Sequence, residues 1–150
     1  MSEFMPGEEF LFEEGSVTFR MNLLCKCDRL WFSNGLSFPL GFKGVSQTGK
    51  LSNKIVLFAE MWKHFRDLGL TGKLDDRNPG DLIWIYSPGF GEAELDHLIV
   101  KDSDRKIFIT AKGRMVSFDN DLYLWTGYSI PTNQILVSDE ATSLLHQMYP

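Results

Sequence analysis

Cysteine is scarce in this sequence, and its placement excludes several kinds of site. Among 150 residues only Cys25 and Cys27 occur. On a strand, two residues at this spacing point to the same face, where neighbours rarely form a disulfide. A structural zinc site needs four ligands, and the three histidines show no ligand spacing. We therefore predict two structural thiols in a reducing compartment, with no metal and no cofactor.

Long apolar runs and an excess of positive charge are also missing. No stretch approaches the ~18 apolar residues of a membrane-spanning helix, and the N-terminus is acidic where a signal peptide would be basic. With 20 acidic against 15 basic residues, the formal net charge of −5 argues against nucleic acid or a membrane as partner. Gly41, Gly44 and Gly49 are too far apart for a phosphate-binding loop. The predicted location is the cytoplasm, which for a viral protein would be that of the host.

Aromatic residues, in contrast, are abundant. Twelve Phe, four Trp and four Tyr supply enough apolar surface for a packed core. The length fits a single domain over 1–150, with 1–9 as a loose leader. Alternation of apolar and polar residues predicts a strand over 17–27, although a helix in the same region, 16–27, also fits. Residues 30–32 are predicted as a second strand, and 36–50 as a loop rich in turn-forming residues.

The second half of the chain combines one strong helix pattern with a series of strand patterns. Apolar side chains follow a helical period over 53–68, with Ser52 as N-cap and Gly69 as C-terminal cap. Short apolar segments separated by turns predict antiparallel strands at 82–86, 94–100, 106–111, 114–118 and 122–126. Ser138 is the expected cap of a last helix over 139–148. The predicted fold is α+β: a mostly antiparallel sheet with one buried helix packed on it and a short C-terminal helix.

Part of this pattern, residues 79–126, resembles the sheet half of the NlpC-type cell-wall peptidases, a papain-like family. A Pro-Gly-Asp sequence at 79–81 opens a strand, His97 follows on the next strand, and Thr110 lies on the third. The resemblance implies an amide hydrolase in which His97 is the catalytic histidine and Thr110 orients it. It also implies a cysteine nucleophile at the start of the preceding helix, 53–68, where this chain has none.

Cys25 or Cys27 would have to supply the thiol in such a hydrolase. A thiolate nucleophile needs a helix N-terminus or an imidazolium beside it, and neither cysteine lies at a predicted helix start. His97 itself fits two roles, a catalytic base or a hydrogen-bonded residue on a half-buried sheet face. The hydrolase, or a degenerate relative that only binds, is thus the alternative hypothesis.

The first hypothesis is a non-catalytic protein-interaction domain of the inhibitor, immunity or adaptor type. Its expected binding residues are Gly89, Phe90, Gly91 and Glu92, because an aromatic residue between glycines is often presented to a partner. The alternative for this loop is a wide turn with Phe90 packed into the core. The expected partner is another protein, bound through aromatic and acidic surface. The sequence specifies neither its identity nor the oligomeric state.

Overall fold

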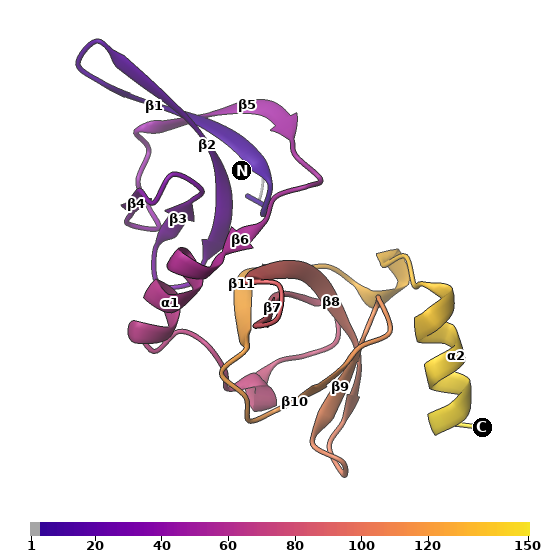
Figure 1. The fold of residues 1–150 in the computed structure, drawn as a ribbon. Coiled ribbons are helices and arrows are strands. Elements are labelled where there is room, and N and C mark those ends of the chain that lie inside the picture. Colours follow the sequence, from indigo (N-terminus) through magenta and orange to yellow (C-terminus); the bar gives the residue numbers. More distant parts are fainter. Residues whose placement is uncertain (1–3) are drawn as a thin grey trace.

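Two antiparallel β-sheets and two α-helices make up the fold, which the computed structural model describes for residues 4–150 (Figure 1). The α+β prediction is confirmed, although the strands form two sheets. Within 4–150, no helix is both long and apolar enough to cross a membrane.

The first sheet is built from the N-terminal third of the chain and has the order β4-β3-β2-β1-β5. Its strands are β1 (Glu8–Glu14), β2 (Val17–Lys26), β3 (Leu30–Phe32), β4 (Ser37–Phe38) and β5 (Val45–Leu51). The strand predicted over 17–27 is confirmed as β2, and the helix alternative is wrong. The prediction of a loop over 36–50 is wrong for the short strand β4 and for β5, an edge strand whose mostly exposed side chains show no apolar alternation.

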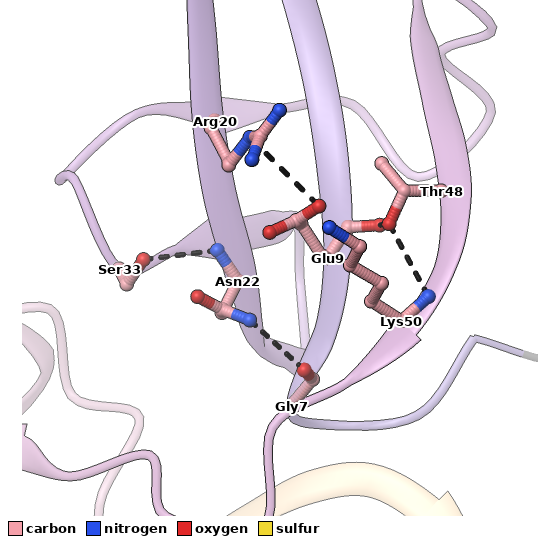
Figure 2. Close-up of polar contacts among 7 residues, drawn as sticks. All are labelled: Gly7, Glu9, Arg20, Asn22, Ser33, Thr48 and Lys50. Atoms are coloured by element: carbon pink, nitrogen blue, oxygen red, sulfur yellow. Dashed lines mark hydrogen bonds and ion pairs between the residues drawn. The ribbon is translucent and has the colours of Figure 1, made fainter.

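The segment before β1 is held to this sheet by hydrogen bonds. The Gly7 N–H donates to the Leu23 carbonyl at 2.8 Å, and the Gly7 carbonyl accepts from Asn22 Nδ2 at 3.0 Å (Figure 2). Glu9 already belongs to β1, and its Oε1 lies 3.9 Å from Arg20 Nε (Figure 2). The prediction of a loose leader over 1–9 is therefore wrong for its last residues, and residues 1–3 lie outside the described chain.

The second sheet contains the five strands that the turn chemistry predicts and a sixth, β6, that falls within the predicted helix 53–68. They are β6 (Leu57–Phe58), β7 (Asp81–Ser87), β8 (Glu92–Asp102), β9 (Ile107–Thr110), β10 (Met115–Ser117) and β11 (Tyr123–Ser129). The order is β10-β9-β8-β7-β11, and β6 pairs with β8. The five predicted strands are confirmed within three residues at each end.

Helix α1 (Ala59–Asp67) is shorter than the predicted 53–68. It begins late because Leu57 and Phe58 pair with β8 as strand β6. Phe58 rather than Ser52 therefore occupies the N-cap position. The cap at Gly69 is confirmed: its φ is +74°, and the Leu70 N–H donates to the Phe65 carbonyl at 3.1 Å, as in a Schellman motif.

A buried cluster contributed by α1 and both sheets fills the junction between them. Figure 1 shows α1 beside this junction. Helix α1 provides Trp62 and Phe65, and the sheets provide Leu24, Cys25, Trp31, Leu57, Trp84, Ala93 and Leu124. A buried hydrogen bond also joins the sheets, from Trp84 Nε1 to the Leu24 carbonyl at 2.9 Å. The helix therefore packs on the junction through one narrow face, and the wide apolar arc expected for it is partly exposed, because Ala59 and Leu68 lie in solvent.

Three short helices complete the chain. They are η1 (Leu74–Asp76), η2 (Thr132–Gln134) and α2 (Asp139–Met148). Helix α2 lies beside β9 and is confirmed with its cap, since the Ala141 N–H donates to Ser138 Oγ at 3.1 Å (Figure 1).

Candidate functional site

The tip of the β7–β8 hairpin presents an aromatic side chain to solvent. The N–H groups of Phe90 and Gly91 both donate to the Ser87 carbonyl at 3.0 Å, which closes the turn. Gly91 has a φ of +68°, a conformation that glycine adopts without strain. The turn leaves Phe90 84% exposed, so the alternative in which it packs into the core is wrong.

A second exposed phenylalanine lies beside this hairpin. Phe58 pairs across strands with Glu92, and its side chain is 64% exposed. Strand alternation explains the exposure, because its neighbour Leu57 points into the junction core. We call Phe58, Gly89, Phe90, Gly91 and Glu92 the aromatic corner. The sequence pattern does not indicate an exposed Phe58, because residues 55–58 fit the helical stripe that continues into α1.

The surroundings of the aromatic corner are acidic. Glu60 is exposed in the first turn of α1, and neither Glu60 nor Glu92 forms an ion pair with any residue of 4–150. Glu94 is paired, with Arg114 Nη2 at 2.7 Å from its Oε2. Two unpaired carboxylates thus flank two exposed aromatic rings.

His97 lies at a different place, on the wall of a cleft between the two sheets. The cleft has a volume of about 310 Å³ and is lined by residues that include Met5, Leu51, Leu82 and Leu136. The His97 Nε2 atom is buried and has no hydrogen-bond partner within residues 4–150. Burial lowers the pKa of His97, which favours the neutral ring.

The Thr110 side chain interacts with Asp96 and not with His97. Its register partner is Leu98, so Thr110 lies on the same face of the sheet as Asp96, opposite to His97. Burial raises the pKa of Asp96, and the hydrogen bond that the Thr110 hydroxyl donates opposes this rise. The Asp96 Oδ1 also accepts from the Lys112 N–H at 3.2 Å. The expected orienting contact between Thr110 and His97 is therefore not formed.

The two cysteines are remote from His97. Cys25 is buried in the junction core, and burial raises its pKa well above the usual value. The Cys27 thiol donates to the Trp125 carbonyl at 3.0 Å. Neither residue lines the cleft of His97. The structure brings together none of the groups that the hydrolase hypothesis requires.

Metal binding and relationships to known proteins give no further indication of a site. Across residues 4–150, no three His, Cys, Asp or Glu side chains gather as metal ligands. Comparison with known proteins finds no matching family model, and no curated protein or solved structure with a significant match.

Proposed function

We propose that this chain is a non-catalytic protein-binding domain of the inhibitor, immunity or adaptor type. Its aromatic corner inserts Phe90 and Phe58 into an apolar socket of the partner protein. The observation that carries the proposal is the 84% exposure of Phe90 at the tip of a fully paired hairpin. A large apolar ring in water contributes nothing to folding, whereas its burial in a partner is worth about 1.5–3 kcal/mol.

The corner is preorganised for such a contact. The β7–β8 hairpin is paired without a break from Leu82 opposite His97 to Ser87 opposite Glu92. Because the backbone is already fixed, binding loses little loop entropy. Aromatic side chains held in this way are typical of the few interface residues that carry most of the binding energy.

The carboxylates near the aromatic rings indicate which charge the partner's binding surface should carry. Glu60 and Glu92 next to the rings favour a socket bordered by Lys or Arg. We therefore expect a partner with a basic rim, and an association rate that falls as salt increases.

The proposal is tested in two steps. A photo-crosslinking residue at position 90 first captures the partner, and affinity is then measured with the purified partner. We expect Phe90→Ser and Phe58→Ser each to weaken binding about 10-fold or more. Leu40→Ser is the matched control, because Leu40 is 51% exposed but belongs to the first half of the chain. Equal loss in the Leu40 control, or unchanged affinity in both Phe variants, would refute the proposal.

Variants without the two carboxylates test whether charge affects the rate of association rather than the stability of the bound complex. Glu60→Gln with Glu92→Gln should slow association at low salt and leave dissociation nearly unchanged. Faster association of this double variant would show that the partner's rim is acidic rather than basic.

A further inference from the structure

A second cleft lies at the other end of helix α1, between the turn that follows the helix and strand β11. It has a volume of about 250 Å³. Leu70, Gly72 and Leu74 line one side, and Arg77, Trp125 and Cys27 also contribute to the wall. The aromatic corner adjoins the first residue of α1, and the nine-residue helix is about 13 Å long at ~1.5 Å per residue. The two sites are therefore separate.

Arg77 is stacked on Trp125 in this cleft. The guanidinium carbon lies 3.9 Å from the centroid of the indole ring. The stack fixes the plane of the guanidinium and shields one of its faces from water. Apart from this stack, the Arg77 side chain makes no hydrogen bond or ion pair with residues 4–150. Its five N–H donors remain available at a fixed orientation.

Trp125 supplies a further unused donor. Its indole nitrogen is buried and has no hydrogen-bond partner within the described chain. A buried polar group without a partner is uncommon in folded proteins, because it costs about 1–3 kcal/mol. The Cys27 thiol donates to the Trp125 carbonyl at 3.0 Å, and within 4–150 it makes no hydrogen bond with the indole N–H. Two residues of the cleft wall, Arg77 and Trp125, thus carry side-chain donors that have no hydrogen-bond acceptor within 4–150.

We infer that this cleft binds a carboxylate that carries a short apolar group. A guanidinium of fixed plane matches the two oxygens of a carboxylate, and the indole N–H is a further donor on a residue that lines the same cleft. Leu70 and the Trp125 ring offer apolar surface for the attached group. Asp76 and Lys73 on the cleft wall offset each other in charge, which leaves Arg77 as the net positive charge and favours a singly charged carboxylate over a doubly charged phosphate. The carboxylate belongs either to a free organic acid or to the C-terminal residue of a peptide.

Nuclear magnetic resonance of the indole N–H groups tests the inference directly. The chain has four Trp, and Trp125→Phe identifies the signal of Trp125 by its loss. Isovalerate and N-acetyl-leucine are titrated separately into the ¹⁵N-labelled protein. We expect each to shift the Trp125 signal to saturation, with a dissociation constant on the order of 1 mM. Tighter binding of N-acetyl-leucine would identify a peptide C-terminus as the source, and equal binding a free acid.

Three controls decide the outcome. Arg77→Gln should weaken binding about 10-fold or more, whereas Arg66→Gln, at an exposed arginine of α1, should leave it unchanged. Unchanged thermal unfolding of both variants shows that the fold is intact. N-acetyl-leucine amide, which lacks the charge, should not shift the signal. A saturable shift with the amide, an equal response to inorganic phosphate, no response to either acid, or undiminished binding by Arg77→Gln would each overturn the inference.

Discussion

Trp62 is one of the two buried side chains by which α1 packs into the junction core, so its truncation tests that core. The residue is 2% exposed and belongs to the cluster that both sheets share. Its ring stacks on Tyr86 with centroids 5.1 Å apart. Strand ladders hold the surrounding residues in place, so the cavity left by Trp62→Ala cannot close fully.

The expected loss in the free energy of unfolding is about 3–4 kcal/mol. Replacing a buried aromatic residue by alanine typically costs 3–5 kcal/mol. We expect a value below the upper end, because Trp62 Nε1 is buried without a partner within 4–150 and its removal recovers part of the cost. The total stability of such a domain is only about 5–15 kcal/mol, so the effect should be large.

Urea unfolding followed by circular dichroism gives the measurement. Trp62→Phe should cost about 1 kcal/mol or less, because it keeps an aromatic ring and removes the unpartnered N–H. Phe58→Ala is the matched control just before the same helix, and it should change stability by only about 0.5 kcal/mol because Phe58 is 64% exposed. A loss below about 1 kcal/mol for Trp62→Ala would show that the helix does not hold the sheets together, and would refute the packing argument.

Two further predictions concern titratable groups. Cys25 and Cys27 should resist alkylation at neutral pH, because burial raises the pKa of Cys25 and the Cys27 thiol is hydrogen-bonded; rapid alkylation near pH 6 that His97→Ala suppresses would contradict this. Burial lowers the pKa of His97, so the unfolded chain takes up a proton first as the pH falls below the ordinary histidine value of about 6.5, and the free energy of unfolding should decrease from there down to the lower, folded-state pKa. His97→Gln should flatten that part of the stability profile, and an unaltered slope would be the contrary result.

Five of the six strands of the second sheet could be predicted because their limits are set locally. Turn-forming residues separate apolar segments that are too close for crossover connections, which leaves antiparallel pairing as the arrangement. Helix α2 is another local case, since the Ser138 hydroxyl caps it directly. Strand β5 could not be predicted in this way, because an edge strand with exposed polar residues carries no period-two signal.

The start of α1 could not be predicted from the sequence, for a different reason. Residues 55–58 are apolar and fit both a helical stripe and a strand, so periodicity alone does not decide between them. Pairing of Leu57 with Ala93 decides it, and this contact joins segments that are far apart in the sequence. The exposed ring at the hairpin tip could be predicted from its flanking glycines. The stack of Arg77 on Trp125 could not, because only the folded chain brings these residues together.

The candidate protein-binding surface depends on strand register. In the predicted helix, Phe58 belongs to the buried stripe with Trp62 and Phe65. In the structure, Leu57 takes the core position opposite Ala93, and strand alternation turns Phe58 outward beside Glu92. A slip of one residue in β6 would bury Phe58 and expose Leu57, which would remove one of the two aromatic rings from the corner. The short β6–β8 pairing therefore fixes both a core side chain and a surface side chain, and any change that weakens it should affect stability and partner binding together.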